Sequence, residues 1–155
     1  MADFNSCLRV KQVFGRFSIA KTIKDMDETF QQISLVGFMK HNGGLEFRTI
    51  SETDYQFRAR IQDMHLNPGG VTHGGFIMSL LDSGMGTAAH RVLGKNSRAA
   101  TISLDVNFIS ASTTGDLLLG TAKVLRKTRS LVFMHGELRC GEHLIATAEG
   151  IWKVL

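Results

Sequence analysis

The second half of the chain reads as one long helix followed by a continuous run of strands, and this order limits the folds open to it. Only short turns separate the strands, so neighbours must run antiparallel, because a parallel pair needs a long crossover. We predict an α+β domain in which a mainly antiparallel sheet wraps around one long central helix. The predicted helix covers 74–92, and the predicted strands cover 101–109, 116–126, 130–139 and 143–154.

The first strand after the helix alternates strictly between apolar and polar residues. Such alternation places the two sets on opposite faces of a sheet. We expect the apolar set to face the helix. The apolar set is Ile102, Leu104, Val106 and Phe108, and the polar set is Ser103, Asp105 and Asn107.

A smaller group of elements is predicted before the long helix. Apolar side chains at helical spacing predict a first helix, a glycine pair predicts a turn, and two further segments have strand patterns. We therefore divide the chain into a helical extension, residues 1–40, and a main domain, residues 41–155. The expected elements are a helix at 22–36, a turn at 41–44, and strands at 45–50 and 55–63.

Composition and charge exclude several classes of protein. The 155 residues suffice for one domain, and 43% hydrophobic with 21% charged residues is typical of a soluble globular chain. We expect a cytoplasmic protein, because there is no bilayer-spanning run, secretory signal or disulfide framework. The basic, acid-poor start leaves a mitochondrial presequence open. The net charge of +4 accompanies no nucleic-acid-binding motif, so we expect neither nucleic acid nor membrane as a partner.

Residues 67–84, NPGGVTHGGFIMSLLDSG, join a glycine-rich loop to the start of the long helix. A helix N-terminus carries unpaired N–H groups and a partial positive charge. Glycine at this place lets a ligand oxygen approach without meeting a Cβ. Gly74 is therefore a candidate for stabilising a developing oxyanion. The pattern lacks the Lys-Ser/Thr of a phosphate-binding Walker loop and the spacing of a dinucleotide fingerprint.

Small residues and one carboxylate share a face of the predicted helix, opposite the bulky apolar residues. The carboxylate of Asp82 therefore lies in an open stripe that a ligand or a second helix could approach. The alternative is a structural hydrogen bond for Asp82 at a helix–helix contact. The stripe consists of Gly75, Ser79, Asp82, Gly86 and Ala89, and the bulky face consists of Phe76, Ile77, Leu80, Leu81 and Ala88.

Gly74 and Asp82 are separated by about 12 Å of helix rise, since each residue adds about 1.5 Å. One carbonyl group cannot contact both residues of the same helix. Two antiparallel helices across a two-fold axis would bring Gly74 of one copy close to Asp82 of the other. We therefore expect a homodimer with two composite sites, and further expect a dimer of dimers.

From about Gly37 to the C-terminus, the chain resembles the hotdog-fold thioesterases of the phenylacetic-acid-degradation (PaaI-like) group. The resemblance rests on the His-Gly-Gly motif at 73–75, with Asn67 six residues before the histidine and Asp82 nine after it. It implies an acyl-CoA thioesterase, which hydrolyses the thioester to a free acid and CoA. The implied enzyme needs no cofactor, because CoA is part of the substrate.

The resemblance also implies roles for individual residues. Gly74 would donate its backbone N–H to the thioester carbonyl. Asp82 of the partner copy would act as the general base or as the nucleophile. Asn67 would orient the water or the thioester, and His73 would support the loop or polarise the carbonyl.

The resemblance further implies a hydroxyl group that positions the attacking water. Ser103 lies where related enzymes place this hydroxyl. Thr101 competes for the same role, because the length of the preceding loop varies.

Four cations lie within residues 123–129, at the predicted tip between two strands. A compact basic patch suits a small polyanion, and a solvated hairpin tip would have the same composition. The resemblance implies that Arg126, Lys127 and Arg129 bind the phosphates of CoA. Thr128 stands where the family often has glycine.

Two other functions on the same fold remain open. One is a protein that binds acyl-CoA without hydrolysing it, and the other is a hydratase or dehydratase of β-hydroxyacyl thioesters. The carboxylate of Asp82 argues against binding alone, and its spacing from His73 favours hydrolysis. No two histidines have metal-ligand spacing, so we expect no metal site. The acyl group of the substrate is not determined by the sequence.

Overall fold

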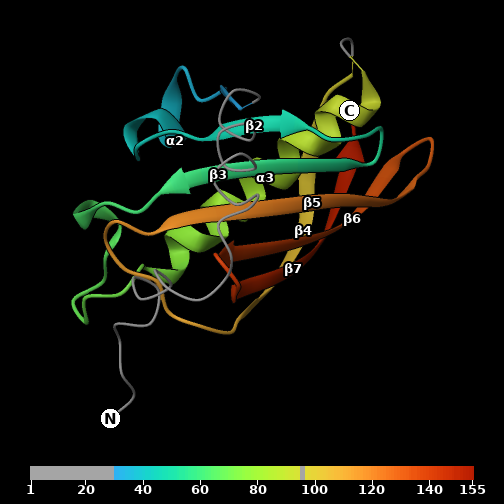
Figure 1. Ribbon diagram of the computed structural model, residues 1–155. Coiled ribbons are helices and arrows are strands. Elements are labelled where there is room, and N and C mark those ends of the chain that lie inside the picture. The colour runs from blue at the N-terminus through green and yellow to red at the C-terminus, as the bar shows by residue number, and fades with distance from the viewer. Residues whose placement is uncertain (1–29, 95–96) are drawn as a thin grey trace, which may run out of the picture.

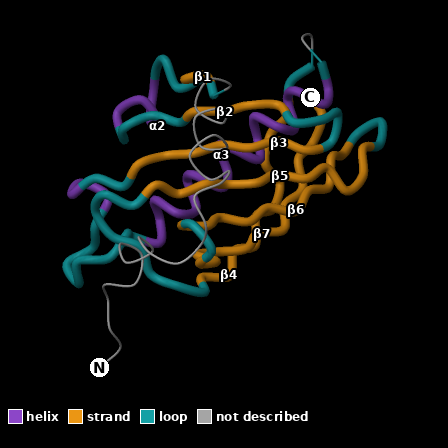
Figure 2. The backbone as a smooth tube through the Cα atoms, viewed as in Figure 1, coloured by secondary structure: helices purple, strands orange, loops and turns teal. Residues whose placement is uncertain are grey.

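A seven-stranded sheet and one long helix account for most of the computed structural model, which describes residues 30–94 and 97–155 (Figure 1). The strand order is β1-β2-β3-β5-β6-β7-β4, and each neighbouring pair is antiparallel. The long helix α3 lies along one face of the sheet (Figure 2). The predicted α+β architecture, with an antiparallel sheet around one long helix, is confirmed.

The elements follow the chain in an order close to the predicted one. Three strands precede α3, the unpredicted short strand β1 among them, and four strands follow it. The bounds are β1 Gln31–Gln32, α2 Gly37–His41, β2 Glu46–Thr49, β3 Asp54–Arg60, a 3-10 turn η1 Asp63–His65, α3 Gly74–Leu93, β4 Ala99–Phe108, β5 Leu117–Lys127, β6 Leu131–Cys140 and β7 His143–Val154.

The bulky face of α3 packs on the sheet, as its spacing predicted. The residues Leu80 and Leu81 are each at most 1% exposed. Phe57 of β3 lies between the helix and β5, where a Cβ added at Gly84 would come 2.4 Å from the ring and one added at Gly120 would come 2.1 Å from it. Glycine is therefore required on both sides of this ring, because a methyl group at either position would overlap it.

The helix predicted at 22–36 is wrong over the part of this segment that the structure describes. Gln31–Gln32 form the short edge strand β1, antiparallel to β2. The Gln32 side chain reinforces this pairing, because its Oε1 accepts a hydrogen bond of 3.1 Å from the Leu45 N–H. Pairing with a neighbouring strand overrides local helical spacing here. The rest of the predicted helix lies outside the described residues, and the division of the chain at residue 40 stays a prediction.

Strand β4 departs from strict alternation at a bulge. Thr101 pairs with Trp152, and Ser103 pairs with the residue directly before Trp152, so Ile102 has no direct partner on β7. An extra residue shifts the phase of a strand. Thr101 therefore faces the same side as the buried Trp152, and Ser103 stays on the opposite face. The predicted place of Ile102 on the helix-facing side was wrong, and its side chain is 57% exposed.

None of the helices in the described residues is long and apolar enough to cross a membrane.

Candidate active site

The N-terminus of α3 begins where the sequence placed it, at Gly74. His73 caps the helix with extended backbone angles, and its Nδ1 accepts a hydrogen bond of 2.9 Å from the Gly75 N–H. The other ring nitrogen, Nε2, then carries the proton of the neutral ring. The structure therefore gives His73 a loop-supporting role, and Nε2 remains available as a donor.

The loop before the helix is held by Asn67. Its side-chain Oδ1 accepts hydrogen bonds from the N–H groups of Gly69, at 2.9 Å, and Val71, at 3.4 Å. Gly70 has a φ of 77°, which favours glycine in this turn. With Oδ1 used inside the loop, Nδ2 is the side-chain atom of Asn67 that can donate to a ligand.

A buried hydroxyl pair fixes the end of the same loop to the chain before β5. The Thr72 N–H donates to the Ser112 carbonyl at 2.8 Å, and the Ser112 hydroxyl donates to Thr72 Oγ1 at 2.7 Å. Both side chains are buried. These bonds set the direction in which the chain enters α3, and so the orientation of its first N–H groups.

His65 also supports this loop, and no motif of the sequence indicated it. Its ring accepts a hydrogen bond from the Gln62 N–H at 3.0 Å, and its Nε2 lies 3.1 Å from the Asn42 carbonyl. The ring also stacks on Phe76 of α3, with centroids 3.7 Å apart. Burial lowers the pKa of His65 below its usual value. A histidine outside any motif has no local signal for such burial.

Asp82 lies two turns along α3, half-buried at the sheet edge formed by β4. The Thr101 hydroxyl donates a hydrogen bond of 2.7 Å to Asp82 Oδ1. The bulge at Ile102 turns the side chains of Thr101 and Ser103 to opposite faces of β4. Thr101 therefore contacts the carboxylate, and Ser103 does not.

The small-residue stripe of α3 is accessible along most of its length. Its first four members are exposed or partly exposed, and Ala89 is the exception, because it is fully buried. The accessible members are Gly75, Ser79, Asp82 and Gly86.

Two cavities flank the N-terminus of α3. One, of about 320 Å³, is lined by Gly74 and Phe108 among other residues. A Cβ added at Gly74 would lie 3.4 Å from the Phe108 ring. The other, of about 390 Å³, lies beside His73 and Gly75 and has apolar walls that include Met64. The structure thus brings Asn67, His73 and Gly74 to one accessible end of the helix. Within one chain it does not bring Asp82 there.

The basic tip between β5 and β6 lies at the opposite end of α3. Lys127 donates a hydrogen bond of 2.8 Å from Nζ to the Val92 carbonyl, near the helix C-terminus. Arg126 and Arg129 are exposed. Thr128 closes the turn itself, because its hydroxyl oxygen accepts from the Leu131 N–H at 2.9 Å. A hydroxyl therefore stabilises this tip without the backbone freedom of glycine.

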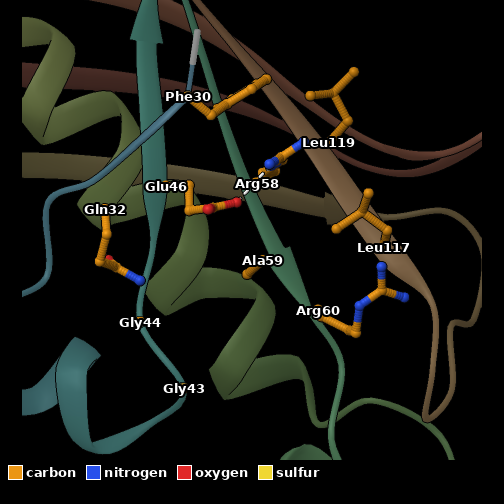
Figure 3. Close-up of a pocket in the computed structure, with 10 residues that line it drawn as sticks. All are labelled: Phe30, Gln32, Gly43, Gly44, Glu46, Arg58, Ala59, Arg60, Leu117 and Leu119. Carbon is orange, nitrogen blue, oxygen red and sulfur yellow. Dashed lines mark hydrogen bonds and ion pairs between the residues drawn. The ribbon is translucent and has the colours of Figure 1, made fainter. Parts of the chain in front are cut away.

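A further cavity, of about 500 Å³, opens on the strands at the other edge of the sheet (Figure 3). Its walls include Glu46 and Arg58, which form an ion pair of 2.5 Å, and Phe30, which lies 4.3 Å below the Arg58 guanidinium. No residue of the predicted site lines this cavity. Among the described residues, no group of three His, Cys, Asp or Glu side chains is arranged to hold a metal ion.

Comparison with known proteins identifies a match to the family model of the thioesterase superfamily over residues 69–147, just over half of the chain. In sequence, a candidate esterase of Pseudomonas aeruginosa is 31% identical over 95 residues, which cover 61% of this chain and 71% of that protein. The matched segment contains the His-Gly-Gly motif and Asp82.

Solved structures share the fold. A candidate thioesterase related to phenylacetic acid degradation, from Ralstonia eutropha, gives a TM-score of 0.70 at 25% identity over 76% of this chain and 90% of that one. A Bacillus halodurans protein solved with CoA gives a TM-score of 0.61 at 25% identity over 64% of this chain and 66% of that one. The predicted resemblance to hotdog-fold thioesterases is confirmed.

Proposed function

Because the chain belongs to the thioesterase superfamily, we propose that it hydrolyses acyl-CoA thioesters to a carboxylic acid and CoA. The observation that carries this proposal is the fixed loop from Asn67 to His73, which ends at the accessible first turn of α3, with Asp82 on the open stripe of the same helix. The Bacillus halodurans relative solved with CoA supports CoA as the acyl carrier.

Gly74 would bind the thioester carbonyl in this reaction. The first N–H groups of a helix have no partner within it, and they lie at the positive end of the helix dipole. As water attacks the carbonyl carbon, negative charge grows on the carbonyl oxygen, and a fixed N–H stabilises it. Asn67 Nδ2 and His73 Nε2 are the neighbouring donors that could orient the substrate.

Asp82 of the partner copy would activate the water. As a general base its carboxylate takes a proton from the water while the oxygen forms a bond to the carbonyl carbon. The tetrahedral intermediate then collapses, the C–S bond breaks, and the CoA thiolate leaves and is protonated. As a nucleophile, Asp82 would instead form an anhydride that water hydrolyses in a second step.

A two-fold axis would have to pass close to Met78 of α3 and to the middle of β4. For Gly74 of one copy to meet Asp82 of the other, antiparallel helices must face each other near Met78, the midpoint between these two residues and an apolar side chain that is 42% exposed. Gly74 lies beside Phe108, and Asp82 lies beside Thr101. Antiparallel pairing of two β4 edges would therefore be centred near Leu104, midway between Thr101 and Phe108.

The same arrangement supports the phosphate assignment. The basic tip lies at the C-terminal end of α3, about 16 Å of helix rise beyond Asp82. In an antiparallel dimer the partner's Asp82 would lie beside Gly74, and the partner's basic tip would lie farther along the same line. A CoA ester extended along this line would present its phosphates to Arg126, Lys127 and Arg129 of the partner.

The proposal is tested by thiol release from a panel of aromatic, medium-chain and long-chain CoA thioesters. Asp82→Asn should lower turnover by at least about a hundredfold, because the base or nucleophile is lost. Asp105→Asn is the matched control, since Asp105 is a carboxylate on the face of β4 away from α3. Circular dichroism and light scattering would establish that both variants keep the fold and the oligomeric state.

Tight acyl-CoA binding by the unmodified protein without thiol release from any ester would contradict the proposal. That result would favour the alternative function, a protein that binds acyl-CoA. Equal turnover by Asp82→Asn and the unmodified protein would contradict the role of the carboxylate.

A further inference from the structure

We propose that Thr101 is the positioning residue for Asp82, a role that rests on the proposed function. Thr101 fixes one oxygen of the carboxylate, so that the other oxygen is presented to the attacking water or the thioester. The sequence comparison with the family favoured Ser103 as the functional hydroxyl of this strand. The bulge in β4 instead favours Thr101 as the hydroxyl that acts on Asp82.

The bulge is what turns Thr101 toward the helix. In regular alternation, Thr101 and Ser103 would share one face, and both would lie away from α3. Ile102 is the extra residue on β4, since Thr101 pairs with Trp152 while Ser103 pairs with Ile151. Trp152 is 1% exposed and belongs to the core beneath α3. Thr101 takes the direction of this core residue and reaches Asp82 at 2.7 Å.

The hydrogen bond restricts the carboxylate at one oxygen only. Thr101 Oγ1 donates its single proton to Asp82 Oδ1, which leaves Oδ2 to accept a proton from water. Threonine is also stiff at its first side-chain torsion, so it holds Oδ1 in a narrow range of positions.

The helix alone does not fix this side chain. Two of the neighbours of Asp82 along the helix, Ser79 and Gly86, are small, so they offer little steric restraint. The Ser79 hydroxyl is used within the helix, where it donates to the Gly75 carbonyl at 2.7 Å. Thr101 is therefore the described hydroxyl that orients the base from outside the helix.

Thr101→Val keeps the shape and the β-branch but removes the donor, and Thr101→Ser restores the donor without the branch. We expect Thr101→Val to lower kcat for the best CoA ester by about ten- to a hundredfold, with KM changed less than about threefold, because the base is misplaced and not the substrate site. Thr101→Ser should recover most of the lost rate, and Ser103→Ala should lower the rate less than Thr101→Val does.

A loss of rate in Ser103→Ala but not in Thr101→Val would overturn the proposal. So would an equal loss of rate in the valine and serine variants, because the serine variant keeps the donor.

A second measurement separates this proposal from the proposed function. The carboxyl carbon of Asp82 can be observed by NMR at neutral pH in the unmodified protein and in Thr101→Val, whether or not any thioester is hydrolysed. Its chemical shift should change in Thr101→Val, where the donor is lost, and stay unchanged in Ser103→Ala. Identical chemical shifts for Thr101→Val and the unmodified protein would overturn the positioning role. If the chemical shifts differ but no ester is hydrolysed, the proposed function fails and the Thr101 contact stands.

Discussion

At the scale of single residues, the loop that enters α3 depends on side chains used as backbone partners. Asn67 holds its own turn, His73 caps the helix, and His65 joins two backbone segments while stacking on Phe76. Each of these contacts gives a hydrogen-bond partner to polar groups that would otherwise lack one after burial or at a helix end. The geometry of the candidate oxyanion site therefore rests on three polar side chains, of which two lie in the recognisable motif.

The buried ring of His65 should make the stability of the protein depend on pH. Its folded-state pKa lies below the unfolded value of about 6.5. The stabilisation is fully present above about pH 6.5 and is lost as the pH falls through the lowered folded-state value, because the unfolded chain binds the proton first. His65→Gln should reduce the slope of unfolding free energy against pH by at most about 1.4 kcal/mol per pH unit.

Urea titrations of the two proteins between pH 5 and pH 8 measure this difference. The remaining histidines are common to both proteins, so their contributions cancel in the comparison. Identical slopes would show that His65 has no part in the pH dependence.

At the scale of elements, glycines decide how closely the helix and sheet approach. Gly84 of α3 and Gly120 of β5 lie on two sides of the Phe57 ring. Gly136 of β6 makes the same kind of contact with Met85, where an added Cβ would lie 2.6 Å from the sulfur. The helix can therefore lie low on the sheet, and its exposed stripe remains open on the opposite side.

Gly120→Ala should destabilise the protein by about 1–3 kcal/mol, because the new methyl group overlaps a buried ring that has no room to move. Combining it with Phe57→Leu should give less destabilisation than the sum of the two single changes, since the smaller side chain removes the overlap. Chemical denaturation of the four proteins in this cycle measures the coupling. Strict additivity would contradict direct contact between the two positions.

At the scale of the whole molecule, one chain separates the parts of the proposed site and two chains would join them. The candidate oxyanion donor lies at one end of α3, the basic tip lies at the other, and the carboxylate lies between them. Among the described residues, strand β4 is the last strand at one edge of the sheet. A long unprotected edge is a place where a second strand can pair.

Pairing of two β4 edges predicts a specific cross-linking pattern. Single cysteines introduced in turn along β4, from Thr101 to Phe108, should give a covalent dimer most readily near Leu104 and least at the two ends, because only residues close to the axis meet their own copies. Non-reducing gels after mild oxidation measure the yield, with the unmodified chain as the control for its native cysteines. A maximum at either end of the strand would contradict the proposed axis.

The basic tip should affect only substrates that carry the CoA phosphates. Replacing Arg126 and Arg129 together by Ala should raise KM for a CoA ester by roughly three- to tenfold, as expected for exposed ion pairs. KM for the matching pantetheine ester should stay unchanged. Lys123→Ala is the control, because this cation lies on β5 opposite Asp54, away from the tip. An equal rise in KM for both esters would argue against the phosphate contacts.

The amino-acid sequence by itself determined the order of the main elements, the buried face of α3, and the start of this helix at Gly74. These features depend on local periodicity and on the conformations that glycine permits, and both are properties of neighbouring residues. The match of the predicted strands to β2 through β7 follows from the same cause.

Only the tertiary structure decided the rest. Gln31 and Gln32 form a strand because β2 offers them hydrogen-bond partners, although their segment has helical spacing. Thr101 lies beside Asp82 because pairing with β7 leaves one residue of β4 unmatched. His65 is buried because distant segments meet around its ring. In each case the deciding partner is remote in sequence, and local pattern carries no information about which remote partner will be present.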